Sequence, residues 1–170
     1  SNIAITLRRV GTVNVTIDET ASDSTVLNAV TNGTGAFANI PALRRLAGAD
    51  MVTLLRNTGS QNSISGVAWI GAYGRAAMSQ YANSMVSVSG DAPVFSGTLV
   101  AHEIGHNMGN NHDRANAGAN YGATSYAYGH VECGNGVVTS GSTPCPTASG
   151  FNTMQTGWGT IMAYYRPTVP

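Results

Sequence analysis

Residues 102–113 read HEIGHNMGNNHD and contain three of the four histidines in the chain. If the first part of this stretch is a helix, His102 and His106 lie about 40° apart around its axis and about 6 Å apart along it, so both imidazoles can reach one metal ion. Gly109 can adopt the left-handed conformation that ends helices, which lets the chain turn and bring His112 from another direction. The stretch therefore predicts a helix, a glycine turn and a site with three histidine ligands.

The ligand set and its neighbour predict catalytic zinc chemistry. Three neutral imidazoles suit Zn²⁺, and three protein ligands leave a fourth position for water, as in catalytic rather than structural zinc sites. Glu103 lies about 100° around the helix from His102, beside the ion and not on it, where it can take a proton from the water and pass it to a leaving amine. The alternative is a helix that carries histidines without binding a metal, and it does not explain the positions of Gly109 and His112.

The pattern HExxHxxGxxH resembles the zinc motif of the metzincin metallopeptidases. Residues 159–164, GTIMAY, resemble their methionine turn, in which the methionine, here Met162, packs beneath the zinc ligands without binding the metal; an ordinary core methionine would look the same. An aspartate directly after the third histidine, here Asp113, resembles the pattern of the reprolysin (adamalysin) branch. The segments ADMVTLL, GVAWIG and GTIMAY, with only two cysteines, are most similar to bacterial secreted enzymes, nearest to the peptidyl-Asp metalloendopeptidases.

This resemblance covers nearly the whole chain and implies its fold. We expect one α/β metallopeptidase domain, residues 1–170, with a twisted mixed sheet of the metzincin type, an active-site helix and an irregular, disulfide-tied C-terminal part. Metzincin domains usually open with a strand and a long helix before the strand that residues 3–10 match. We therefore expect the domain to lack that first strand and helix, or to receive them from a separate N-terminal fragment.

The resemblance also implies residues that contact substrate. Residues 66–71, GVAWIG, match the metzincin strand at the sheet edge that pairs antiparallel with a peptide, so Val67, Ala68 and Trp69 are candidate substrate-binding residues; the alternative is an ordinary half-buried strand. Tyr164 follows Met162 by two residues and is a candidate stabiliser of the tetrahedral intermediate, against the alternative of a packed turn tyrosine.

A preference for aspartate just after the scissile bond would need a cation in the pocket that receives this side chain. The enzymes of nearest resemblance cleave on the amino side of aspartate, and a guanidinium can bind a carboxylate through two hydrogen bonds. In metzincins this pocket is formed by residues just past the methionine turn, which makes Arg166 the candidate. The alternative is a solvent-facing arginine near a chain end.

The remaining elements follow from local patterns. Residues 41–47, PALRRLA, predict a short helix with proline near its start and Gly48 past its end. Little regular structure is expected in residues 114–157. The other predictions are a long strand or a bent pair of strands at 3–17, a short helix or loop at 18–39, a buried strand at 50–55, a strand at 85–89 and the active-site helix within 93–108.

Composition indicates a location and excludes some partners. Cys133 and Cys145 flank eleven residues rich in Gly, Ser, Thr and Pro, and a disulfide there would stabilise the fold by about 3 kcal/mol in the chain-entropy model. The alternative, a second metal site, has no CxxC spacing in its favour. A disulfide implies an extracellular or, alternatively, periplasmic protein. Zero formal net charge and 9% charged residues give no basic surface for nucleic acid, and no apolar run suits a membrane.

Together these observations predict a secreted zinc endopeptidase acting on a peptide or protein substrate as a monomer. His130, the histidine outside the motif, is expected to be a surface or hydrogen-bonded residue and not a ligand. Two other functions stay open at this point: a zinc-bearing binding module without catalysis, which the intact Glu103 disfavours, and a zinc hydrolase acting on a non-peptide amide.

Overall fold

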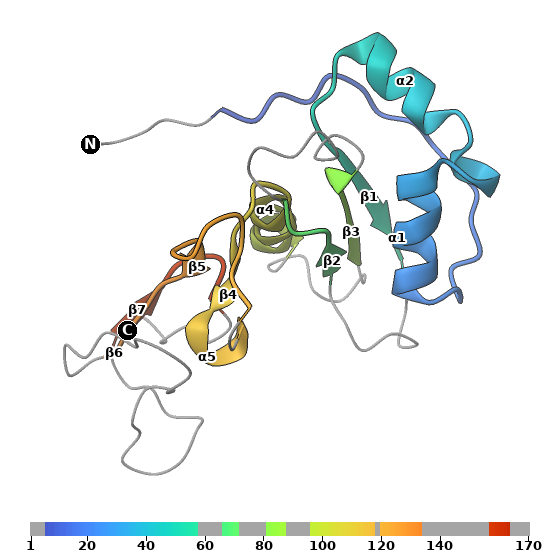
Figure 1. Cartoon of the computed structure of the whole chain (residues 1–170). Helices are drawn as coiled ribbons and strands as arrows, with labels where there is room; N and C mark the ends of the chain where they lie inside the picture. Colours follow the sequence, from blue (N-terminus) through green and yellow to red (C-terminus); the bar gives the residue numbers. More distant parts are fainter. Residues whose placement is uncertain are drawn as a thin grey trace.

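The computed structural model describes residues 6–57, 66–71, 81–87, 96–117, 120–133 and 157–163. Within these ranges the chain is a mixed α/β structure, which agrees with the α/β class predicted from the sequence (Figure 1). The elements of its first half are α1 (Asp23–Asn32), the 3-10 helix η1 (Gly35–Phe37), α2 (Ile40–Ala47), β1 (Val52–Arg56), β2 (Gly66–Ala68) and β3 (Asn83–Ser87). Those of its second half are α4 (Ser96–Asn107), β4 (Asn111–Asp113), α5 (Arg114–Ala117), β5 (Tyr128–Gly129), β6 (Val131–Cys133) and β7 (Gly157–Gly159).

A three-stranded mixed sheet carries the first half. Its order is β1-β3-β2, with β1 parallel to β3 (Val52 opposite Asn83) and β2 antiparallel to β3 (Gly66 opposite Val86). Helix α1 packs on one face of this sheet and α4 on the other (Figure 1). Among the described residues, β2 is therefore an edge strand, and it lies against the helix that carries the histidines.

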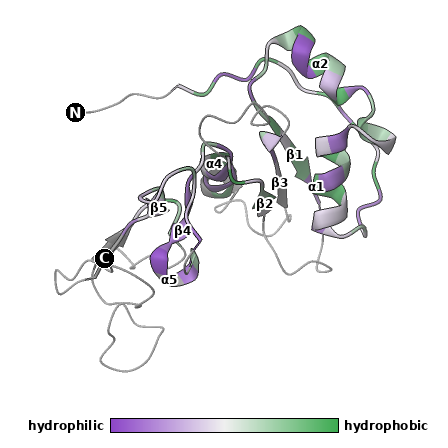
Figure 2. Ribbon diagram, viewed as in Figure 1, coloured by the Kyte–Doolittle hydropathy of each residue, from purple (hydrophilic) through white to green (hydrophobic). Residues whose placement is uncertain are grey.

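The core of the first half lies between α1 and the sheet. Val26 and Val30 of α1 and Phe37 of η1 are buried together, and Val67 of β2 packs against them. In Figure 2 both α1 and α2 carry hydrophobic as well as hydrophilic stretches, as expected of helices with one covered face. Helix α1 begins after Ser22, whose hydroxyl accepts a hydrogen bond from the Thr25 N–H, a common helix start.

Several local predictions agree with the structure. For residues 18–39 the sequence predicted a short helix or a loop, and the structure has the helix α1 there. Helix α2 begins one residue before the predicted stretch 41–47 and ends at Gly48, which has a φ of 61°. The predicted strands at 66–71 and 85–89 are present as the shorter β2 and as β3, and only short regular elements occur in the described part of residues 114–157.

The prediction of a strand at residues 3–17 is wrong for the part described, residues 6–17. No strand forms there, and Leu7, Val10 and Val13 remain about half exposed, while Val15 and Ile17 pack against the core. Alternating β-branched residues favour an extended backbone, but a strand also requires a neighbouring backbone to bond with. This segment passes alongside the domain as an extended chain without joining the sheet.

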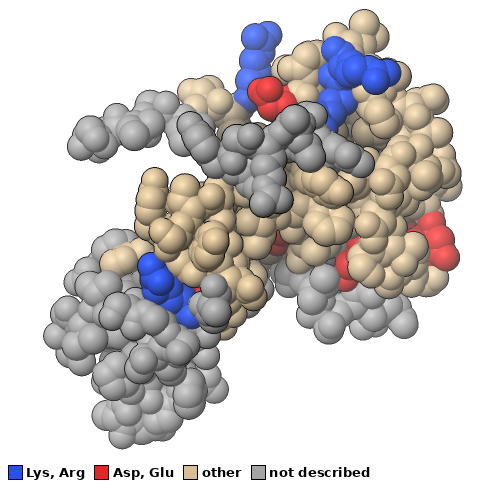
Figure 3. Space-filling view, in the orientation of Figure 1, with Lys and Arg blue, Asp and Glu red and all other residues tan. Residues whose placement is uncertain are grey.

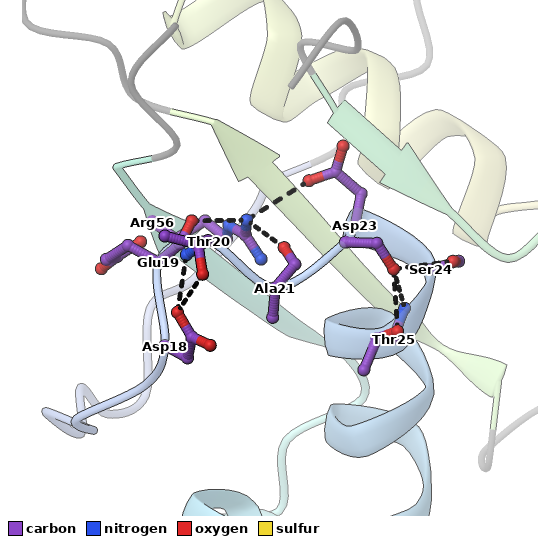
Figure 4. Close-up of polar contacts among 9 residues, drawn as sticks. Asp18, Glu19, Thr20, Ala21, Asp23, Ser24, Thr25 and Arg56 are labelled. Atoms are coloured by element: carbon purple, nitrogen blue, oxygen red, sulfur yellow. Dashed lines mark hydrogen bonds and ion pairs between the residues drawn. The ribbon is translucent and has the colours of Figure 1, made fainter. Parts of the chain in front are cut away.

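The strand predicted as buried at residues 50–55 is only partly so. It forms as β1, but Leu55 is 59% exposed. The prediction assumed a strand covered on both faces, whereas the face of β1 that carries Leu55 is not covered. At its end, Arg56 is buried and its Nη2 donates to the carbonyl oxygens of Glu19 and Ala21 and lies 3.7 Å from Asp23 Oδ1 (Figure 4). This arginine connects β1 to the start of α1.

Besides α4 and α5, the described second half of the chain contains two short pairs of strands. Strands β4 and β5 pair in parallel, and β6 and β7 pair antiparallel, with Val131 opposite Gly159. The disulfide predicted for Cys133 and Cys145 lies outside the residues whose side chains are described. On the face shown in Figure 3 charged side chains form a few small separate groups. No helix in the described ranges is both long and apolar enough to cross a membrane.

Candidate metal centre and active site

The helix that carries His102 and His106 ends just before Gly109. Helix α4 stops at Asn107, and Gly109 has a φ of 94°, the left-handed region that the sequence predicted. The N–H groups of Gly109 and Asn110 donate to the carbonyl oxygens of His106 and Gly105, the paired hydrogen bonds of a Schellman helix end. The chain then reverses into β4, which carries His112 back toward the helix.

This turn brings the three predicted ligands together. One ligand atom from each of His102, His106 and His112 lies within 4.8 Å of the others, and His106 Nε2 is 3.0 Å from His112 Nε2. With Zn–N bonds of about 2.0–2.1 Å, two nitrogens on a tetrahedral zinc are separated by about 3.3 Å. The pair at 3.0 Å is close to this separation, and the three ligand atoms are grouped closely enough to hold one metal ion.

Backbone carbonyl groups orient two of the rings. His102 Nδ1 lies 2.7 Å from the Ile161 carbonyl oxygen and His106 Nδ1 lies 2.8 Å from that of Asn110. Because a carbonyl oxygen can only accept, each Nδ1 carries the proton and donates it, which leaves Nε2 with a free electron pair for a metal. These partners are the usual support of histidine ligands, and the sequence motif did not reveal them.

Burial keeps two of the imidazoles neutral. Desolvation lowers the pKa of His106, against an opposing effect of its hydrogen bond to Asn110. The pKa of His112 is lowered to about 4, mainly by desolvation and to a smaller extent by the positive charges that His106 and His102 can carry nearby. Neutral imidazole is the form that binds metals, so these rings are ready for a cation near pH 7.

Glu103 is buried beside the three histidines, with 3% of its surface exposed. Desolvation raises the pKa of its carboxyl group to about 7. Its Oε2 atom is buried without a hydrogen-bond partner in the described part of the protein. A carboxyl group with a pKa near neutrality can both take up and return a proton, as a general base and acid must.

The side chain of Met162 lies against the active-site helix at Gly105. Its side chain is buried, and a Cβ atom added to Gly105 would overlap its sulfur. The absence of a side chain at Gly105, between the two helical histidines, therefore lets the turn at residues 160–163 approach the helix. The same turn supplies the Ile161 carbonyl oxygen to His102.

The candidate substrate residues are Val67 and Ala68 of β2 and Trp69 directly after it, and their side chains do not all face the same side of the sheet. Val67 packs against the core on the α1 side, and the indole N–H of Trp69 donates to Thr31 Oγ1 of α1 at 2.7 Å. Because side chains alternate along a strand, Ala68 lies on the α4 side. The side chains of Val67 and Trp69 therefore face away from the histidines.

Asn107 connects the active-site helix to the sheet and was not singled out from the sequence. Its side chain is 3% exposed, and its amide donates to the carbonyl oxygens of Trp69 and Asn83, both at 2.9 Å. The Gly71 N–H donates to the carbonyl oxygen of His106 at 2.8 Å. These bonds set the position of β2 relative to the histidines. The only sequence signal is a polar residue one position after the second ligand, where the helix ends.

The other predicted residues lie around the site or outside the described ranges. Asp113 is buried and accepts from the Asn116 side-chain amide with both oxygens. His130 is not part of the histidine cluster, and its backbone N–H donates to Thr160 Oγ1. Tyr164 and Arg166 fall outside the described residues, as does Cys145.

Comparison with known proteins gives the family. Residues 1–165 match the model of the reprolysin-like members of metallopeptidase family M12B. No curated protein sequence matches the chain significantly. Since the family model extends over almost the whole chain, and the histidine cluster its members need is assembled in the structure, this protein belongs to the reprolysin-like M12B metallopeptidases and is a zinc metalloendopeptidase.

Proposed function

We propose that His102, His106 and His112 hold a zinc ion and that Glu103 carries the proton during hydrolysis of a peptide bond. The observation that carries this proposal is the buried carboxyl group of Glu103 beside three imidazoles whose nitrogens are spaced for one ion. Zinc, when bound, supplies Lewis-acid chemistry that polarises the peptide carbonyl group and makes a water molecule nucleophilic. Glu103 takes a proton from that water and returns it to the departing nitrogen.

The edge of the sheet fits an extended peptide. The Trp69 N–H donates to the Asn83 carbonyl oxygen, so Trp69 and Asn83 form a hydrogen-bonded pair of the antiparallel ladder. Such pairs alternate with pairs whose backbone groups point away from the partner strand. The backbone groups of Gly66 and Ala68 therefore face the free edge of β2, where a peptide can add as a further strand. This favours peptides over a small non-peptide amide.

Two variants test the zinc chemistry. Wild-type protein should contain one zinc per chain and hydrolyse casein, and a chelator should stop hydrolysis until zinc is returned. His106→Ala should lose the metal, whereas Glu103→Gln should keep it and lose about 10²–10⁴-fold in kcat, because proton transfer is removed and the ligands stay. Stoichiometric zinc in His106→Ala, or normal turnover in Glu103→Gln, would refute the assignment of the corresponding residue.

The finer expectations on specificity and location belong to this proposal. We expect a bacterial secreted or periplasmic monomer of one domain, with a Cys133–Cys145 disulfide that thiol titration before and after reduction would detect. Tyr164 is a candidate for stabilising the tetrahedral intermediate, and unchanged turnover in Tyr164→Phe would remove it. The preference for aspartate after the scissile bond, through Arg166, is supported by the resemblance of the sequence to peptidyl-Asp metalloendopeptidases.

A further inference from the structure

The side chain of Glu103 occupies the space that a side chain at position 66 would need. A Cβ atom built on Gly66 would lie 2.5 Å from Glu103 Oε1 and 2.9 Å from both Cδ and Cγ. Carbon atoms that are not bonded pack at about 3.5–4.0 Å, so the end of the Glu103 side chain would have to shift to admit even a methyl group. All three atoms belong to the part of Glu103 beyond its own Cβ.

Gly66 is required here for its lack of volume and not for its backbone conformation. The described glycines with a positive φ are Gly33, Gly35, Gly48 and Gly109, and Gly66 is not among them. The backbone at position 66 is thus one that alanine could adopt. What excludes alanine is the carboxyl group of Glu103.

The strand side of this contact is held in place, so an added side chain at position 66 would displace the end of the Glu103 side chain. On one side, β2 is paired with β3 and is held at its far end by the hydrogen bond from Asn107 to the Trp69 carbonyl oxygen. On the other side, Glu103 lies on α4, between two of the histidines. Its Oε2 atom has no hydrogen-bond partner in the described part of the chain. Packing against the backbone of Gly66 is therefore one contact that limits where the carboxyl group can lie.

We propose that Gly66 is a positioning residue: its bare backbone receives the Glu103 side chain and sets the distance between the proton-transferring carboxyl group and the strand along which the peptide lies. This rests on the proposed function of Glu103. The same strand would then hold the substrate through outward backbone groups and limit the position of the base through its inner face. A side chain at position 66 would displace the carboxyl group while leaving the three histidines untouched.

A double-mutant cycle in protein stability tests the contact without using activity. Gly66→Ala should lower the thermal midpoint of the zinc-loaded protein clearly, because the methyl group meets Glu103. In the Glu103→Ala background the three obstructing atoms are gone, so the same Gly66→Ala change should be neutral or raise the midpoint, since alanine loses less chain entropy than glycine in a strand. Equal losses in both backgrounds would overturn the proposal.

Kinetics tests the consequence for the base. Gly66→Ala should keep one zinc per chain, and its kcat should fall by about 100-fold with a smaller change in KM, the scale expected when a catalytic group is misplaced by about 1 Å. Gly11→Ala is the matched control, because an added Cβ there meets nothing within 4 Å and no positive φ is required. Wild-type kcat in zinc-loaded Gly66→Ala would overturn the proposal. If the wild-type protein lacked peptidase activity, the stability cycle would still decide the contact, so the two proposals can fail separately.

Discussion

Replacing Asn107 by alanine should separate the active-site helix from the strand proposed to bind substrate. The side-chain amide of Asn107 donates to the carbonyl oxygens of Trp69 and Asn83, both at 2.9 Å, in a buried position. These two hydrogen bonds link the end of α4 to the end of β2 and the start of β3, beside the bond from the Gly71 N–H to the His106 carbonyl oxygen. The orientation of the amide is not ambiguous, because both partners are acceptors and only the NH₂ group can face them.

The size of the effect follows from what each carbonyl group loses. The Asn83 oxygen keeps the Trp69 N–H as a donor at 3.4 Å, so its loss is that of an ordinary hydrogen bond, about 1 kcal/mol. The Trp69 oxygen likewise loses the hydrogen bond from the Asn107 amide, about another 1 kcal/mol. The sum is about 2 kcal/mol of unfolding free energy. For a domain of this size that corresponds to a fall of roughly 4–8 °C in Tm.

Denaturant and thermal unfolding of the zinc-loaded protein measure this loss, and zinc analysis with kcat/KM measures its effect on the site. We expect stoichiometric zinc and reduced kcat/KM in Asn107→Ala. Asn107→Asp keeps the shape but places acceptors against acceptors, so it should be less stable than the alanine variant. Asn39→Ala is the control, because Asn39 is exposed and its side chain makes no capping hydrogen bond. A loss below about 0.5 kcal/mol in Asn107→Ala would refute the reasoning.

Three further changes examine other parts of the protein. Gly105→Ala should destabilise the zinc-loaded protein by about 1–3 kcal/mol through overlap with the sulfur of Met162, and stability equal to wild type would show that the methionine turn can move away. Arg56→Ala should cost about 3 kcal/mol because it leaves Asp23 buried without its cation; Asp23→Asn in the same chain should recover part of this, and zinc content should not change. Arg166→Ala should lower kcat/KM for peptides with aspartate after the scissile bond far more than for matched apolar peptides, and equal losses would contradict the specificity proposal.

Residues 102–113 show how much of a site can be determined locally. The spacing of His102 and His106 follows from the helical period, and the turn at Gly109 follows from the conformational freedom of glycine. Both depend only on residues close in the chain. The sequence therefore determined that a helix would end at this glycine and that His112 would return toward it, and the structure has the three ligand atoms within 4.8 Å of one another.

The contacts that complete the site were decided by the tertiary structure. Glu103 meets Gly66, Gly105 meets Met162, and Asn107 bonds to two strands, and each of these contacts joins residues far apart in the sequence. A glycine that is needed for space looks the same in a sequence as one needed for a turn.

The strand prediction was wrong for residues 6–17 for the same reason. Alternation of apolar residues is a property of one segment, but a strand exists only when another backbone pairs with it. The sequence by itself determined the helix end at the histidine motif and which three histidines come together as candidate metal ligands. The fold decided which segments pair, which side chains are displaced by a neighbour, and how the edge strand stands against the catalytic helix, because these depend on packing between distant parts of the chain.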